Sequence, residues 1–165
     1  MMNLKSIAQI FVAPLLILTS VVPSVQGQVP GQPADEASAQ KWLPRSKDPI
    51  WSKLIQCKVN YDKKTGEFGI NVTPEVRALD GQTVSVRGFV LPMDGADRTK
   101  HFLLTRNTPV CLYCPPGEPN EIIEVVSERA VEWTDSVVTV TGKMSLIDNG
   151  ENALFFKITV AQVRQ

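Results

Sequence analysis

Two cysteines in a proline-rich segment are the side chains of this chain most suited to chemistry. Cys111 and Cys114 form a Cys-x-x-Cys pair, which Pro115, Pro116 and then Asn120 follow. Two thiolates at this spacing can face one ion, and soft sulfur ligands select zinc or copper(I). Because proline fixes its own φ and restricts the residue before it, the chain is stiff beside these thiols. This segment is therefore the candidate site.

A complete metal site needs more ligands than one pair, and the sequence offers two others. His101 is the single histidine of the chain, and Cys57 is the third cysteine. Imidazole is the commonest metal ligand, and a thiolate binds zinc and copper(I) as well. Both residues therefore join Cys111 and Cys114 as candidate ligands for zinc or copper(I). The candidate recognition residues of the same loop are Tyr113, Pro115, Pro116 and Asn120.

Two other interpretations of the three thiols stay open. In an oxidising compartment Cys111 and Cys114 can form a disulfide with each other, or Cys57 can pair with either, which makes the loop structural. The other is a thiol–disulfide redox protein. Redox proteins of the thioredoxin kind place such a pair at a helix N-terminus after a βαβ pattern, whereas here two prolines follow it.

The N-terminal residues have the pattern of an export signal. Lys5 precedes an apolar run over residues 7–18, and small residues end at Gly27. We predict cleavage between Gly27 and Gln28, with the mature protein in the periplasm or secreted. The apolar run is short and contains Pro14, so we expect no permanent membrane span.

The remaining chain divides into a linker and one domain. Residues 28–49 are rich in proline and small residues and predict a flexible linker, since they cannot bury enough apolar surface to fold. Residues 50–165 are long enough for a single core.

Charge and motif content exclude several function classes. The chain has 17 Lys plus Arg and 17 Asp plus Glu, which argues against a nucleic-acid partner. Phosphate loops, Ser-His-Asp order and His-Glu-x-x-His are absent from the sequence, so we expect no catalytic centre. We interpret Glu121 and Glu124 as charged residues exposed to solvent, and Arg106 as a charged residue without a partner.

The pattern of elements predicts an all-β fold. Asp48 and Pro49 predict the start of one short N-terminal helix over residues 49–56, and Thr73 predicts one more helical turn. Alternation predicts a hairpin over residues 59–72 and strands near residues 83–90, 101–105, 122–126, 137–144 and 154–163.

The glycines of these strands favour a barrel. Gly88 and Gly142 lie where strongly coiled strands need space for a bend. We therefore predict a small OB-like Greek-key barrel, with a β-sandwich as the alternative. In the last strand Leu154, Phe156, Ile158 and Val160 are expected on one face.

A family resemblance rests on the order of these motifs. Residues 79–93, then residues 102–104, Cys111, Pro115-Pro116 with Asn120, and residues 140–142 together resemble the bacterial exported family called domain of unknown function 3299. The resemblance covers residues 51–163 and implies a periplasmic all-β domain, often encoded beside ABC-type transporter components, with no established reaction. Many relatives carry a histidine two places after the first cysteine, where this chain has Tyr113.

These observations together lead to one functional expectation. The chain is expected to be an exported, non-catalytic binding or accessory module that serves an envelope ABC-type transporter or another periplasmic protein. Zinc or copper(I) binding is one chemistry open to the cysteine loop, and a structural disulfide among the three thiols is the other. A periplasmic thiol–disulfide redox protein and a purely structural interaction domain are the alternatives.

Overall fold

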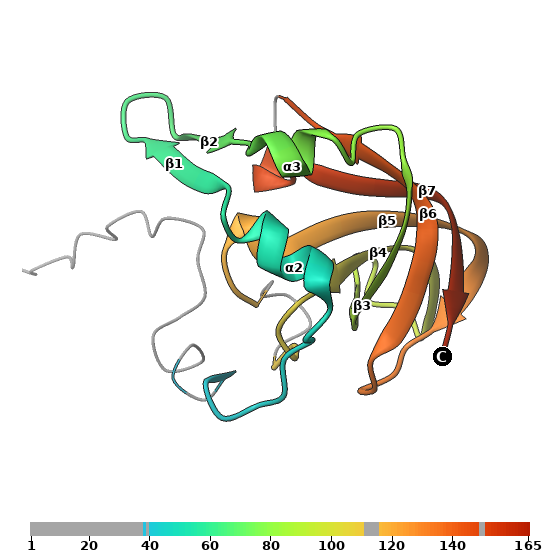
Figure 1. The fold of residues 1–165 in the computed structure, drawn as a ribbon. Helices are drawn as coiled ribbons and strands as arrows, with labels where there is room; N and C mark the ends of the chain where they lie inside the picture. The colour runs from blue at the N-terminus through green and yellow to red at the C-terminus, as the bar shows by residue number, and fades with distance from the viewer. Residues whose placement is uncertain (1–37, 39, 111–115, 149–150) are drawn as a thin grey trace, which may run out of the picture.

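The computed structural model describes residue 38 and residues 40–110, 116–148 and 151–165. Within them the fold is all-β, as predicted, and five strands close a barrel (Figure 1). The strands are β3 (Thr83–Pro92), β4 (Arg98–Thr105), β5 (Ile122–Glu132), β6 (Val138–Leu146) and β7 (Phe156–Arg164). Their order around the barrel is β3-β4-β5-β7-β6, and β6 returns to β3. A closed five-stranded barrel is the OB-like architecture that the glycines predicted, and it excludes the sandwich.

The barrel contains one parallel pair, and all its other neighbours are antiparallel. β5 and β7 run parallel, while β7 pairs antiparallel with β6. β3 pairs with β6 as far as Gly88 and with β4 from Phe89 onward, so β3 changes partner at Gly88. A Cβ atom at Gly88 would lie 2.8 Å from the carbonyl oxygen of Thr105. The backbones approach too closely there for any larger residue, which is the bend expected at this position.

The last strand contains a β-bulge that the sequence did not predict. Val160 has a φ of 51° and is 63% exposed, whereas Ala161 is buried. The expected face of Leu154, Phe156, Ile158 and Val160 is therefore wrong at Val160. The extra residue of a bulge shifts the alternation by one position, so Ala161 takes the inward place. The expected face is also wrong at Leu154, which precedes β7 and packs against a second cluster formed by Leu91, Leu103 and Ile122.

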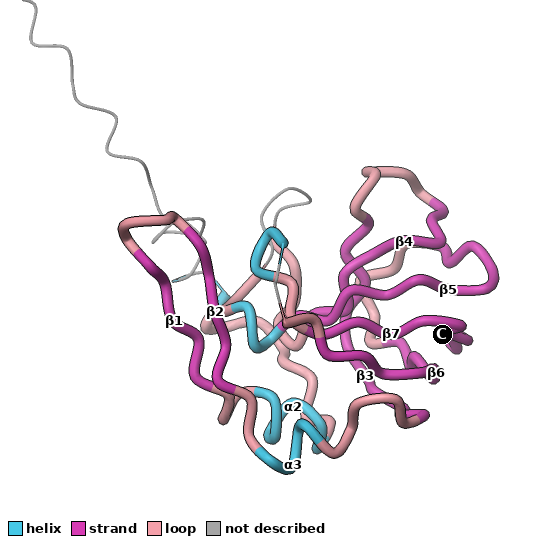
Figure 2. The backbone as a smooth tube through the Cα atoms, turned by 90° about the horizontal axis from the view of Figure 1, so that it is seen from above, coloured by secondary structure: helices cyan, strands magenta, loops and turns pink. Residues whose placement is uncertain are grey.

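Short elements cover one end of the barrel. Helix α2 (Pro49–Leu54) begins where predicted, because the Asp48 carboxylate accepts a hydrogen bond from the Ile50 amide at 3.0 Å. A hairpin of β1 (Lys58–Asp62) and β2 (Glu67–Asn71) follows, and then α3 (Pro74–Arg77). Figure 2 shows α2 and α3 side by side, with the hairpin projecting away from the barrel.

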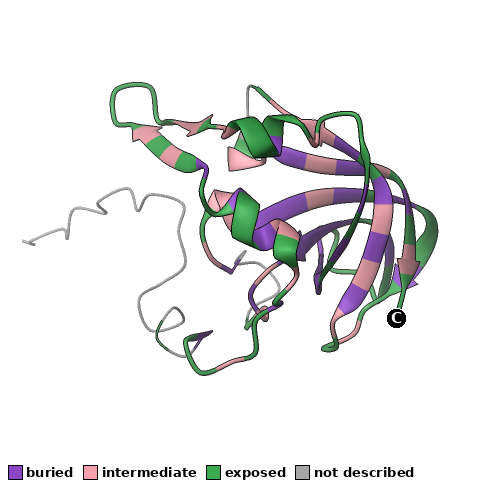
Figure 3. Cartoon of the chain, viewed as in Figure 1, coloured by how far each residue is buried: buried purple, intermediate pink, exposed green. Residues whose placement is uncertain are grey.

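The core is continuous from these helices into the barrel. Trp51 and Leu54 of α2 and Val76 of α3 are buried in one cluster with the barrel interior, which includes Phe102 and Ile158. The alternation of buried and exposed residues along the strands is visible in Figure 3. The single-turn 3₁₀ helix η1 (Pro119–Glu121) precedes β5, and η2 (Glu151–Ala153), a turn in which Asn152 and Ala153 have positive φ, precedes β7. None of the helices in the described ranges combines the length and apolarity that crossing a membrane requires.

The C-terminal part of the predicted linker, residues 40–48, lies against the barrel, and we call it the strap. The Ser46 amide donates to the Arg106 carbonyl at 2.8 Å, and the Gln40 side chain donates to the Thr108 carbonyl at 2.6 Å. Thr108 in turn donates its hydroxyl to the Pro44 carbonyl at 2.6 Å. The strap therefore runs beside the chain that leads into the cysteine segment. The linker residues before residue 38, and the predicted cleavage point at Gly27 and Gln28, lie outside the described residues.

Candidate functional site

One carboxylate holds both ends of the cysteine segment. Glu121 Oε1 accepts a hydrogen bond from the Arg106 guanidinium at 2.5 Å, and its Oε2 accepts one from the Asn107 side chain at 3.1 Å. The same Oε2 accepts from the backbone amide of Glu118 at 3.2 Å. Arg106 and Asn107 come just before the segment, whereas Glu118 and Glu121 come just after it. We call Arg106, Asn107, Gly117, Asn120 and Glu121 the loop base.

The backbone reinforces this closure. The Arg106 amide donates to the Glu121 carbonyl at 3.0 Å, which brings the two strand ends together. Gly117 has a φ of +100°, and a Cβ atom there would collide with Asn107 Nδ2 and Glu121 Oε2. A glycine is therefore required where the returning chain crosses the loop base.

Asn107 is the most enclosed polar residue of the loop base. It is 4% exposed, and its amide donates to Glu121 and, at 3.4 Å, to the Pro116 carbonyl. Its Oδ1 is buried without a partner among the described residues. Because both of its neighbours on the Nδ2 side are acceptors, the orientation of the amide is fixed by the contacts.

Asn120 connects the loop base to the end of α2. Its side-chain amide donates to the Cys57 carbonyl at 2.9 Å and to the Ile55 carbonyl at 3.4 Å. The structure thus brings two of the predicted site residues, Asn120 and Cys57, into direct contact. Cys57 itself is 1% exposed and belongs to the core cluster.

The other predicted loop residues divide between described and undescribed positions. Pro116 is buried, and its carbonyl contacts Asn107. Cys111, Tyr113, Cys114 and Pro115 lie outside the described residues, so the predicted metal ligation stays a prediction. Within the described ranges, no three His, Cys, Asp or Glu side chains come together as a metal site would need.

His101 lies in a separate charged cluster on the outer face of the barrel. Its Nε2 donates to Glu124 Oε1 at 2.7 Å, and the Lys157 ammonium donates to the same oxygen at 3.1 Å. The three residues come from β4, β5 and β7. They therefore form a row across three neighbouring strands, which we call the Glu124 row.

Electrostatics keep the carboxylate of this row ionised. Burial opposes its ionisation, but the hydrogen bonds from His101 and Lys157 outweigh burial and hold the pKa of Glu124 below its usual value. A second carboxyl pKa is lowered at Asp94, where the Ala96 amide donates a hydrogen bond and Thr99 adds another.

Sequence reasoning missed both Glu121 and Glu124. The expectation that they are solvated charges is wrong, since their side chains are 15% and 14% exposed, and Glu121 forms one ion pair and Glu124 two. Arg106 is likewise paired rather than a single charge. Spacing along the chain carries no signal for these contacts, because each joins residues on different strands or across a loop.

Comparison with known proteins points to one family. The family described as protein of unknown function (DUF3299) matches residues 29–159. Among solved structures, the chain aligns with the crystal structure of a DUF3299 family protein from Pseudomonas aeruginosa PAO1. The two share 19% sequence identity with 81% of each chain covered, and the TM-score is 0.47. No curated protein matches the chain.

Proposed function

The chain belongs to the DUF3299 family, and we propose that it is an exported, non-catalytic binding module. Its binding element is the segment between Asn107 and Asn120, which connects the end of β4 to the start of β5. The expected partner is an envelope ABC-type transporter or another periplasmic protein, and the expected ion is zinc or copper(I) bound through Cys111 and Cys114.

The observation that carries this proposal is the loop base. Glu121 contacts Arg106 and Asn107 on one side of the segment and the Glu118 amide on the other. Holding the two ends of a loop on a rigid scaffold lowers the conformational entropy that the loop loses when it binds. Functional loops on β-barrels are commonly built in this way.

Neither of the two carboxyl groups with a shifted pKa is poised as a general acid. The pKa values of Glu124 and Asp94 are both lowered, so both groups are ionised at neutral pH. A carboxyl group that serves as a general acid near neutral pH needs the opposite shift. Each of the two instead makes hydrogen bonds that stabilise its charged form.

Metal titration tests the ion-binding part of the proposal. Reduced protein is titrated with zinc and with copper(I) under anaerobic conditions, as wild type and as Cys111→Ser and Cys114→Ser. We expect a dissociation constant below about micromolar, roughly −8 kcal/mol, that both variants lose. His101→Gln and Cys57→Ser, examined in the same titration, identify any further ligands.

Two results would contradict that expectation. If neither ion binds this tightly, or if Cys114→Ser behaves as wild type, the loop does not bind metal. If the unreduced protein instead has the lower mass expected for a disulfide, and reductant restores the higher mass, the redox or structural interpretation replaces the metal-binding one.

N-terminal sequencing tests the export part. Protein from the envelope fraction should begin at or near Gln28. Recovery of membrane-bound protein that still begins at Met1 would contradict both the cleavage and the proposed location.

A further inference from the structure

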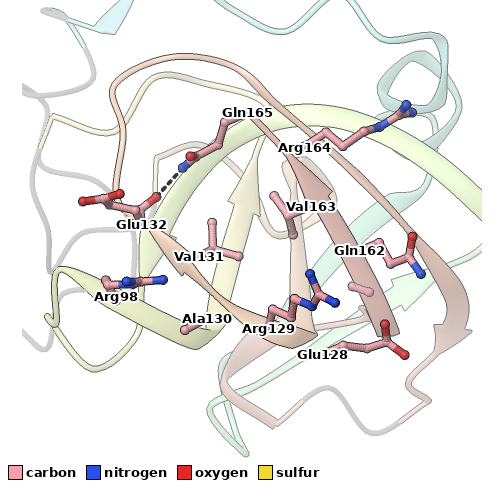
Figure 4. A pocket seen from close by; sticks show the side chains of 11 residues that line it. Arg98, Glu128, Arg129, Ala130, Val131, Glu132, Gln162, Val163, Arg164 and Gln165 are labelled. Carbon is pink, nitrogen blue, oxygen red and sulfur yellow. Dashed lines mark hydrogen bonds between the residues drawn. The ribbon is translucent and has the colours of Figure 1, made fainter.

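The barrel wall has an opening between its two parallel strands. The pairing of β5 with β7 includes Glu124 with Lys157, Val125 with Ile158 and Ser127 with Ala161, and it ends there. Beyond that point a cavity of about 440 Å³ lies between the strands (Figure 4). This volume is within the range of ordinary ligand sites. We call it the β5–β7 groove.

Each strand beside the groove is still paired on its far side. In β5, Val131 and Glu132 pair with Thr99 and Arg98 of β4. In β7, Val163 and Arg164 pair with Val140 and Thr139 of β6. These pairs hold the ends of both strands in extended form, whereas residues 128–130 of β5 lie in a register shift between Val126 and Val131 and pair with neither β4 nor β7. The edges of both strands toward the groove have no strand-to-strand pairing. Unpaired strand edges of this kind are templates for another strand.

The groove has an apolar floor and a charged rim. The floor consists of Val131 and Ala161, which are buried, and of Val163, which packs against the core. Figure 4 shows Val131 and Val163 lying between the charged side chains of the rim. The charged rim residues are Arg98, Arg129, Arg164, Glu128 and Glu132.

The rim carries one more positive than negative side chain. In the described part of the chain, none of its three arginines takes part in an ion pair. Their guanidinium groups are therefore available to carboxylates of a ligand.

We propose that the β5–β7 groove receives an extended peptide segment of a partner protein, which inserts as a sixth strand of the barrel wall. The side chains of a strand alternate between its two faces. One set would lie on the valine floor and the other among the rim charges, where acidic residues fit best. The ligand class is therefore a peptide that alternates small apolar and acidic residues.

The direction of the inserted strand follows from the barrel. Because β5 and β7 are parallel to each other, an inserted strand is either antiparallel to both or parallel to both. Antiparallel pairing is the more stable arrangement per residue. The inserted segment is thus expected to run opposite to β5 and β7, with backbone hydrogen bonds to each.

One side chain now occupies part of the groove edge. Gln165 donates its side-chain amide to the Glu132 carbonyl at 2.7 Å, across the gap between the strands. That carbonyl is an acceptor that an inserted strand would use. Gln165 therefore competes with the ligand, and its removal should strengthen binding.

The experiment uses a synthetic peptide and amide NMR of the whole mature protein. The probe is a seven-residue peptide that alternates Glu and Val, acetylated and amidated at its ends. We expect a dissociation constant below about 1 mM, with shifted and exchange-protected amides at residues 127–132 and 161–165. The matched control has the same side chains but is N-methylated at every second residue, which removes its donors to one of the two strands.

Each outcome decides the proposal. Loss of binding on N-methylation, together with about threefold tighter binding of the probe to Gln165→Ala, supports strand insertion. Gln162→Ala is the control, because Gln162 also lines the groove but does not bridge it. Equal binding of the N-methylated peptide, shifts confined to another face, or no binding of the probe would overturn the proposal. None of these measurements involves the cysteines, so failure of the metal proposal is a separate result.

Discussion

Val160 of β7 is the extra residue opposite Gly142 of β6. The register places Thr141 with Gln162 and Lys143 with Thr159, so Gly142 faces both Val160 and Ala161. A Cβ atom at Gly142 would lie 2.7 Å from the Thr159 carbonyl oxygen. The glycine thus provides the space in which β7 bulges. The pairing of β5 with β7 also shifts register at this point, so the bulge lies where the groove begins.

Replacing Val160 with glycine should stabilise the protein. A β-branched residue at a φ of 51° is strained by about 1–3 kcal/mol, and Val160 is 63% exposed, so little packing is lost. Glycine's greater freedom in the unfolded chain offsets about 0.5–1 kcal/mol. We expect a net gain of about 1 kcal/mol in urea unfolding. Val126→Gly, on an exposed position of β5 that does not have a positive φ, is the control and should destabilise; equal losses in both variants would refute the strain.

Adding one methyl group at Gly88 or Gly142 should be costly. The new Cβ would lie 2.8 Å from the Thr105 carbonyl oxygen at Gly88 and 2.7 Å from that of Thr159 at Gly142. We expect Gly88→Ala and Gly142→Ala each to lose about 1–3 kcal/mol in thermal unfolding. Gly95→Asn serves as the control, since its surroundings are open and asparagine tolerates its positive φ. A normal melting temperature for Gly88→Ala would show that the strands separate easily.

Glu121→Gln should weaken the loop base. The glutamine amide has one acceptor oxygen, so its NH₂ group must face a donor, either Arg106 or Asn107 with the Glu118 amide. We expect a loss of about 2 kcal/mol and faster hydrogen exchange at the Glu118 amide. Glu67→Gln, on the exposed hairpin, should change neither quantity. If the two variants behave alike, Glu121 does not hold the loop.

Stability should fall in acid in part because of Glu124. Its pKa is lowered in the folded protein from an ordinary value of 4.5, so its contribution is complete above that pH. The contribution is then lost as the pH falls through the lowered value, since protonation ends the bonds from His101 and Lys157. Urea midpoints measured from about pH 6 to pH 3 should fall more steeply for wild type than for Glu124→Gln. Parallel profiles would mean that the Glu124 row contributes no pH-dependent stability.

Local chemistry made much of the fold predictable. The cap at Asp48, the turn before β2 and the alternation of β3 each depend on neighbouring residues, and the structure confirms them. Gly88 and Gly142 correctly indicated a barrel, because only glycine fits where two backbones approach this closely, and a glycine within a strand is visible in the sequence. The Val160 bulge could not be found in this way, since its valine continues an apparently regular alternation.

The site was less predictable because its contacts are non-local. Glu121 reaches residues 14 and 15 positions away, and Glu124 contacts Lys157 from 33 positions away. The second half of β5 was also missed, because it contains the charged residues Glu128, Arg129 and Glu132, and the strand was expected to end near residue 126. Only the register of β4, β5 and β7 places these side chains together.

The burial of Trp51 beneath the barrel determines how small the folding unit can be. A fragment that begins at Thr83 contains every strand of the barrel, yet it lacks Trp51, Leu54 and Val76, each at most 1% exposed. It also lacks the indole that donates to the Arg87 carbonyl at 2.7 Å. Cutting the chain there would open the base of the core to water. The segment from α2 to α3 is therefore an integral floor, and a shortened version of this protein must retain it.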